Sequence, residues 1–172
     1  MASESPMNAK LTINCLEDFP RQLEAHYAEI PEAFKHWAPA SWEGVPSEAL
    51  TAIEQVCHVR DIEILGYQLR FRRTLEELTP TLASLDTDAL VIERGYASSD
   101  AAQALAVFRK ARAETVALIR SLRPEQFART AVFEGYGPLS LQSLVHYLCS
   151  HDQQHLAGLQ WLLGKIAAAR AA

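Results

Sequence analysis

The sequence of 172 residues predicts an all-α protein, a four-helix bundle in a single domain, and three observations lead to this prediction. Apolar residues recur every three or four positions along four long stretches, which is the period of a helix that buries one face. Segments with Pro, Gly or helix-capping residues separate the stretches. No two segments show the alternation of apolar and polar residues that is typical of paired strands. Four amphipathic helices bury their apolar faces together as a bundle.

The first predicted helix begins near Asp18, a suitable N-cap that is followed by Pro20 in the first turn. We expect Pro31 to kink or interrupt this helix, because proline removes a backbone hydrogen bond. Residues 1–15 are expected to form a flexible tail, and residues 38–46, which are rich in Pro and Gly, a loop.

The second predicted helix runs from a cap at Ser47 to Leu78 and is apolar on most sides, so we expect it to be largely buried. One strip along its first half is polar and holds Glu54, His58 and Asp61. A polar patch that passes into an apolar stripe is typical of a site inside a bundle.

A long connector, residues 79–98, follows the second helix. Connectors of this length usually have a function or form a crossover between helices, here helices 2 and 3. The third predicted helix is capped by Ser98, Ser99 or Asp100 and ends near Leu122.

The fourth predicted helix is capped by Ser140 and extends to Ile166. Residues 123–139 before it are expected to form a turn that begins with proline, followed by an extended segment. Residues 167–172 are expected to form a second flexible tail.

The composition argues against several classes of protein. The net charge of −5 disfavours a surface for nucleic acid or for anionic membranes. No apolar run approaches the roughly 18 residues of a membrane span, and the start of the sequence shows no secretion signal. Three cysteines, far apart and odd in number, are typical of reduced thiols. We therefore expect a cytoplasmic protein that binds neither nucleic acid nor membranes.

Two histidines of the fourth predicted helix, His151 and His155, carry the clearest chemical signal. Their spacing places one imidazole a turn above the other, about 40° round the helix. Both lie on a largely apolar stripe, where polar groups without partners cost free energy. A shared metal ion is one way to satisfy both rings. The alternative is a pair of core or rim histidines that are hydrogen-bonded to backbone or water.

His58 strengthens the metal hypothesis, because it lies as far into the second predicted helix as His151 does into the fourth. Three neutral imidazoles from two helices make a site with open positions for water and substrate. Asp61, one turn further along, is a candidate acceptor that orients a ligand ring. Glu54 is an alternative carboxylate ligand.

Arg112 interrupts the apolar stripe of the third predicted helix, and an inward-facing guanidinium is rarely left unpaired. One interpretation is an ion pair with Glu54 or Asp61 that fixes the bundle. The other is an anchor for a substrate carboxylate, to which the fork of donors is suited. Three further side chains are candidates for lining the same cavity, with a packing role as the alternative for the last: Tyr147, Trp37 and His26.

The sequence resembles the DinB/YfiT-like family of small bacterial four-helix-bundle metalloproteins. The resemblance rests on HVRDIE from His58, HDQQHLAGLQ from His151 and ERGYASSD before the third helix. It implies an up-down-down-up bundle, often a homodimer, in which three histidines hold a divalent metal such as zinc or nickel. The family's ligands correspond here to His58, His151 and His155.

The resemblance also implies an activity on a small molecule, since relatives include thiol transferases that use bacillithiol, mycothiol or glutathione. We therefore expect a metal-dependent enzyme that carries out thiol transfer, with a low-molecular-weight thiol, or hydrolysis. One alternative is a non-catalytic binding protein whose metal is structural or absent. Another is a buried stability network of Arg112 and the polar strip with no ligand. A closed four-ligand site would favour a structural metal, and an open site would favour the enzyme.

Overall fold

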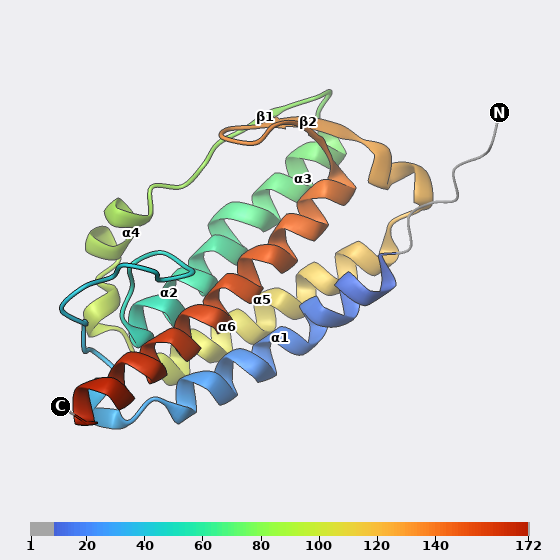
Figure 1. Ribbon diagram of the computed structural model, residues 1–172. Coiled ribbons are helices and arrows are strands. Elements are labelled where there is room, and N and C mark those ends of the chain that lie inside the picture. Colours follow the sequence, from blue (N-terminus) through green and yellow to red (C-terminus); the bar gives the residue numbers. More distant parts are fainter. Residues whose placement is uncertain (1–8, 172) are drawn as a thin grey trace.

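A computed structural model describes residues 9–171 and shows a bundle of four long helical segments (Figure 1). The first segment is α1 (Lys10–Glu29), and the last two are α5 (Ala101–Ser121) and α6 (Leu141–Ala171). The second segment consists of α2 (Ala52–Asp61), the π-helical turn η2 (Ile62–Tyr67) and α3 (Gln68–Glu76), which continue one another. The prediction of a four-helix bundle is confirmed.

Short elements join these four segments. They are η1 (Glu32–Phe34) after α1, α4 (Thr87–Glu93) and η3 (Tyr96–Ser98) between α3 and α5, and η4 (Pro124–Ala128) after α5. The connector predicted at residues 79–98 therefore contains helical turns of its own.

A three-stranded sheet lies at one end of the bundle, beside α3 (Figure 1). Its strands are β1 (Thr81–Leu82), β2 (Thr130–Phe133) and β3 (Gly137–Ser140), with β1 parallel to β2 and β2 antiparallel to β3. The extended segment predicted within residues 123–139 is present, but the expectation of no paired strands was wrong. Strands of two and four residues are too short to show a recognisable alternation.

The first helix begins at Lys10, earlier than the predicted start near Asp18, so residues 10–15 are not a tail. The remainder of the predicted tail, residues 1–8, lies outside the described residues. Leu16 is fully buried, because the inward face of the helix continues before Asp18. Burial of an apolar face stabilises a helix more than a single cap does.

The first helix ends at Glu29, so Pro31 interrupts it rather than kinking it. Ile30 has φ −67° and ψ 120°, an extended conformation. This conformation is the one favoured before a proline. The chain then turns away from the helix axis and leads to the segment that precedes α2.

The second helix begins later than predicted. Its N-cap is Thr51 instead of Ser47, and the Glu54 side chain accepts a hydrogen bond of 2.8 Å from the backbone N–H of Thr51. This reciprocal arrangement is a capping box, which satisfies backbone donors at the helix start. Residues 47–50 therefore belong to the preceding segment, and one of them contributes to the site described below.

The other helix boundaries agree with the sequence in part. Asp100 is the N-cap of α5, and its carboxylate accepts a 2.8 Å hydrogen bond from Gln103 N–H. Ser140 precedes α6 as predicted, and its hydroxyl accepts from the Ser143 N–H at 3.2 Å. Residues 167–171 are not the predicted tail, because α6 continues to Ala171, and residue 172 lies outside the described residues.

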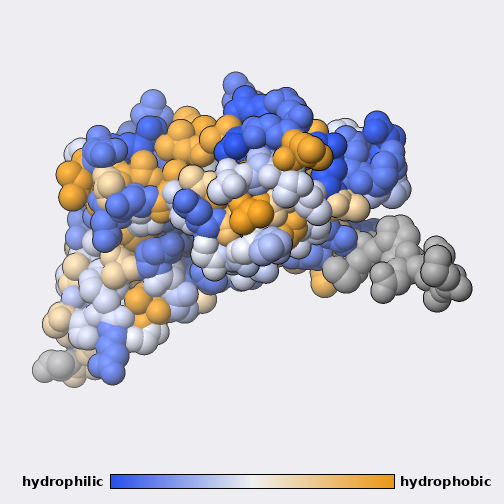
Figure 2. Space-filling view, turned by 90° about the horizontal axis from the view of Figure 1, so that it is seen from above, coloured by the Kyte–Doolittle hydropathy of each residue, from blue (hydrophilic) through white to orange (hydrophobic). Residues whose placement is uncertain are grey.

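Two clusters of buried apolar side chains form the core, one around Phe19 and Phe108 and the other around Phe71 and Phe133. On the face seen from above, hydrophobic and hydrophilic residues are intermixed (Figure 2). Within residues 9–171, no helix combines the length and the apolar character that a membrane span requires.

Candidate metal centre

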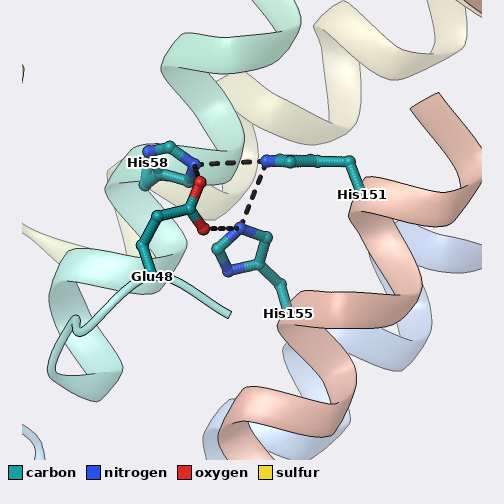
Figure 3. Close-up of side chains that lie close together, drawn as sticks. All are labelled: Glu48, His58, His151 and His155. Carbon is teal, nitrogen blue, oxygen red and sulfur yellow. Dashed lines mark hydrogen bonds and ion pairs between the residues drawn. The ribbon is translucent and has the colours of Figure 1, made fainter. Parts of the chain in front are cut away.

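Four side chains from three parts of the chain point toward one another in the interior of the bundle (Figure 3). His58 comes from α2, His151 and His155 come from α6, and Glu48 comes from the segment before α2. The Nε2 atom of His151 lies 3.2 Å from Nε2 of His58 and 3.2 Å from Nε2 of His155. The Glu48 carboxylate places Oε1 3.5 Å from His58 Nε2 and Oε2 3.2 Å from His155 Nε2.

The two helices bring the three rings together as the spacing predicts. His151 and His155 lie one turn apart on α6, with ring centroids 4.5 Å from each other. His58 faces both of them from α2, with centroids 5.3 Å from His151 and 4.8 Å from His155. The His58 and His155 rings are fully buried, while His151 is half-buried. The structure thus brings together the three histidines that the sequence singled out.

Glu48 is the member of the cluster that the sequence did not reveal. It lies in an irregular segment, so no helical period predicts the direction of its side chain. The segment is held against α6 by Trp42, whose ring stacks on Trp161 at 5.8 Å between centroids and 16° between planes. Gly44 supports this approach, because it has φ +82° and lies next to the Trp161 indole nitrogen. The Glu48 side chain stays 39% exposed.

The hydrogen bond of His155 determines which of its nitrogens faces the cluster. Its Nδ1 lies 3.1 Å from Oε1 of Gln55, and the Gln55 Nε2 donates to the Leu50 carbonyl at 3.3 Å. The second contact orients the amide so that Oε1 faces His155 and accepts the Nδ1 proton. The Nε2 lone pair of the neutral ring then points at Glu48 and His151.

The donor set fits a divalent cation. A lone pair of His155 faces a carboxylate oxygen at 3.2 Å, and these two acceptors repel each other unless a positive charge lies between them. In a tetrahedral zinc site with Zn–N distances of about 2.0–2.1 Å, neighbouring ligand atoms are about 3.3 Å apart. All four ligand atoms of the cluster lie within 4.8 Å of one another. Imidazole nitrogens suit several transition metals, zinc and nickel among them.

Two histidines of the cluster have lowered pKa values, which favours the neutral form that binds a metal ion. Burial and the neighbouring rings of His155 and His58 lower the pKa of His151 well below 6.5, and burial also lowers the pKa of His155. Burial by itself would raise the pKa of Glu48, but hydrogen bonds and positive charge from His155 and His58 in their protonated forms outweigh burial and lower the pKa. At neutral pH His151 and His155 therefore offer neutral imidazoles.

The metal-free protein is expected to lose stability as the pH falls below 6.5, in part through His151. Its pKa is lowered in the folded state, so the unfolded state takes up the proton first as the pH falls. The test is the free energy of unfolding at pH 5 to 7.5 for the wild type and for His151→Gln. Below pH 6.5 the free energy of unfolding of the wild type should fall relative to that of His151→Gln. The substitution His36→Gln, at an exposed position, should leave the pH dependence of the free energy of unfolding unchanged.

This comparison of variants is needed because a neighbouring group acts in the opposite direction. Burial raises the pKa of Asp152 to about 7, against the lowering effect of Arg112, so protonation of Asp152 favours the folded state at lower pH. A difference between wild type and His151→Gln that is constant from pH 5 to 7.5 would contradict the prediction for His151.

Two predicted site residues lie elsewhere. Glu54 caps α2 and is not part of the cluster, so the carboxylate near the histidines is Glu48 instead. Asp61 does not orient the ring of His58. Its carboxylate instead accepts a 2.8 Å hydrogen bond from the Tyr96 hydroxyl and pairs with two arginines, listed here as Arg60 and Arg94. The helix turns Asp61 toward the connector before α5, where Tyr96 and Arg94 lie.

Arg112 is a buried structural residue with partners other than those predicted. Its side chain is 1% exposed and forms ion pairs with Glu63 at 2.8 Å and with Asp152 at 2.7 Å, not with Glu54 or Asp61. The guanidinium donates two hydrogen bonds to Glu63, two to Asp152 and one to the Leu16 carbonyl. All five of its donors are therefore used within the protein. The interpretation as an anchor for a substrate carboxylate was therefore wrong.

The remaining candidates also make contacts outside the cluster. Tyr147 is 37% exposed and its ring lies 4.7 Å from that of Tyr136. His26 donates from Nδ1 to the Gln22 carbonyl at 2.8 Å, as the packing alternative predicted. Trp37 packs edge-to-face on Phe34 at 5.5 Å.

Comparisons with known proteins agree with this picture. The family model of the DinB superfamily matches residues 16–159. A similar solved structure is YfiT from Bacillus subtilis, described as a probable metal-dependent hydrolase with an unusual four-helix bundle topology. The similarity has a TM-score of 0.80 at 21% identity and covers 97% of this chain and 90% of that chain, which shows a shared fold. A search of curated proteins found no match.

Proposed function

Because the chain belongs to the DinB superfamily, we propose that it is a metal-dependent hydrolase whose cation is held by His58, His151 and His155. The observation that carries this proposal is the position of Glu48, a carboxylate 3.2 to 3.5 Å from two of the three imidazole nitrogens. Zinc and nickel are the expected metals. A bound cation of this kind supplies a polarising centre and lowers the pKa of a coordinated water to about 7.

Glu48 provides the general base that hydrolysis needs. A base must lie within hydrogen-bond distance of the water whose proton it accepts. The carboxylate faces the centre of the cluster, where the positive charge of a bound cation would lower its pKa and keep it ionised at neutral pH. The water oxygen would attack the carbonyl carbon of an ester or amide while Glu48 accepts its proton. The bond from that carbon to the alcohol or amine would then break, and the leaving group would take up the proton from Glu48. The partial exposure of Glu48 supports access for a small substrate.

The competing role of Glu48 is that of a fourth ligand. A closed site of three imidazoles and one carboxylate is typical of a structural metal. The same carboxylate therefore supports either an enzyme or a non-catalytic binding protein, depending on whether it binds the cation or a water molecule. The substitution described next separates the two roles.

In Glu48→Gln the proposed enzyme is expected to keep its metal and lose hydrolysis. Removal of a general base typically lowers the rate by about 10²–10⁴-fold. The measurements are zinc affinity and the turnover of a panel of small esters and amides by zinc-loaded protein. Glu54→Gln, a substitution at the capping box, is the matched control and should affect neither. A fall in zinc affinity in Glu48→Gln, with no turnover in the wild type, would contradict the hydrolase and favour a structural metal.

Thiol transfer remains the second reaction, and it is supported by the family resemblance alone. The same panel is therefore run with and without low-molecular-weight thiols and with electrophilic substrates. Turnover that requires the thiol would replace hydrolysis by transfer. The small-molecule substrate and the homodimer are likewise proposals that rest on the resemblance.

We also infer an up-down-down-up order of the helices. The support comes from pairs of contacting residues. Between parallel helices, residue numbers increase along both helices from one contact to the next. Between antiparallel helices, they increase along one helix and decrease along the other. The pairs are Thr12–His146 for α1 with α6, Glu17–Arg120 and Glu24–Arg109 for α1 with α5, and His58–His151 and Gln55–His155 for α2 with α6. Arg112 adds to the first set, because it joins Leu16 to Asp152.

A further inference from the structure

We propose that Gln55 is a positioning residue that fixes the tautomer and the orientation of His155, and that Gly158 leaves the space in which the Gln55 amide lies. This inference rests on the proposed function in one respect, namely that the cluster holds a divalent cation. The orientation of the His155 ring in the metal-free protein does not depend on it.

Gln55 reaches His155 from the opposite helix. It is fully buried on α2, one turn before His58, so this helix supplies both a candidate ligand and the group that orients another. Its Oε1 accepts from His155 Nδ1 at 3.1 Å, and its Nε2 donates to the Leu50 carbonyl at 3.3 Å. With the two ends of the amide engaged, the oxygen cannot exchange places with the nitrogen without losing both contacts.

His155 differs in this respect from the other two histidines. Among the described residues, Nδ1 of His58 and Nδ1 of His151 are buried and have no hydrogen-bond partner. Ligand histidines usually donate their second ring nitrogen to a neighbouring acceptor, which raises the basicity of the ligand atom and fixes the ring. In this cluster Gln55 supplies that acceptor for His155.

Gly158 makes the position of Gln55 sterically possible. It lies on α6, three residues after His155, and is buried against α2. A Cβ atom at this position would lie 2.8 Å from Oε1 and 3.0 Å from Nε2 of Gln55, and would also meet the Ser47 hydroxyl. These atoms are the ends of side chains, so an added methyl group would displace the amide while the helices keep their places.

Replacement of Gln55 by leucine should weaken zinc binding by about 10–100-fold, the usual effect of removing such an acceptor. Gln55→Glu keeps an oxygen for the Nδ1 proton and should bind zinc nearly as well as the wild type. Gln68→Leu removes a half-buried glutamine of α3 that bonds to α5 and is the matched control. Affinities are measured by competition with a chelator of known zinc affinity, on protein stripped of metal.

A second pair of variants tests the role of the space. Gly158→Ala should weaken zinc binding in the same way as Gln55→Leu, and the double variant should be no weaker than Gln55→Leu alone. Gly164→Ala is the matched control on the same helix, since a Cβ there meets nothing within 4 Å. Equal zinc affinities for Gly158→Ala and Gly164→Ala would overturn the inference, even if Gln55→Leu failed to fold.

The tautomer is read directly from ¹⁵N-resolved imidazole NMR spectra of the metal-free protein. The wild type should carry the His155 proton on Nδ1, and Gln55→Leu should shift it toward Nε2. A wild type that binds no zinc but shows the Nδ1–H form would refute the proposed function and support the positioning role. The same tautomer in wild type and Gln55→Leu, together with the same zinc affinity, would overturn the positioning role and leave the proposed function intact.

Discussion

Arg112→Met is expected to lower the free energy of unfolding by about 3–5 kcal/mol, the usual cost of removing one partner from a buried ion pair. The substitution leaves Glu63 and Asp152 buried at 0% and 1% exposure without a positive charge. Natural domains have a total stability of about 5–15 kcal/mol, so the loss is a large part of the whole. Urea unfolding at pH 7.5, followed by circular dichroism, measures it.

The control for this prediction lies on the same helix. Arg120 pairs with Glu17 at 2.6 Å, but the two side chains are 48% and 52% exposed. Arg120→Met should therefore change the stability by less than about 1 kcal/mol. Similar losses for Arg112→Met and Arg120→Met would show that the buried pairs do not hold the bundle together.

Zinc is expected to raise the thermal unfolding midpoint of metal-free protein by about 5–11 °C when present at a hundred times its dissociation constant. Binding to the folded state alone contributes about 2.7 kcal/mol at that concentration. In a domain of this size each kcal/mol shifts the midpoint by about 2–4 °C. His151→Ala removes one of three imidazoles and should abolish the shift, which differential scanning calorimetry with and without a chelator would detect.

His151 is the best of the three positions for this test because it is half-buried, so its truncation disturbs the core least. His146→Ala is the control, since His146 lies on the same helix and bonds to Thr12 at 3.0 Å, away from the cluster. If zinc stabilised His151→Ala as much as the wild type, the ion would bind somewhere other than at this cluster.

The long helices were predictable because apolar residues recur along them with the period of a helix. The positions of their ends depended on local contacts. Capping chemistry alone predicted Ser140 and included Asp100 among three candidates. Lys10 was missed because tertiary packing determines where α1 begins. Thr51 was missed although Thr51 and Glu54 have the spacing of a capping box, because the prediction placed the cap at Ser47. The sheet was missed because strands of two and four residues are too short to show an alternation, and because β1 pairs with β2 from a distant part of the sequence.

The site was predictable to the extent that its residues lie on helices. A spacing of four residues and a similar depth in two helices were enough to group His58, His151 and His155. Glu48 lies in an irregular segment, where sequence periodicity carries no information on side-chain direction. Arg112 was recognised as paired, but its partner Glu63 lies in the π-helical turn. A π-helix changes which residues share a face, so the α-helical period used for the prediction no longer applied.

The stacked indoles of Trp42 and Trp161 give the protein an intrinsic fluorescence signal that depends on their contact. Trp42 precedes Glu48 in the same segment, and Trp161 is anchored on α6, the helix of two of the histidines. Any displacement of the Glu48 segment from that helix separates the two rings and alters their fluorescence. Stopped-flow emission measurements on the unlabelled protein would therefore follow the movement of this segment during metal or substrate binding, with Trp161→Phe as the reference.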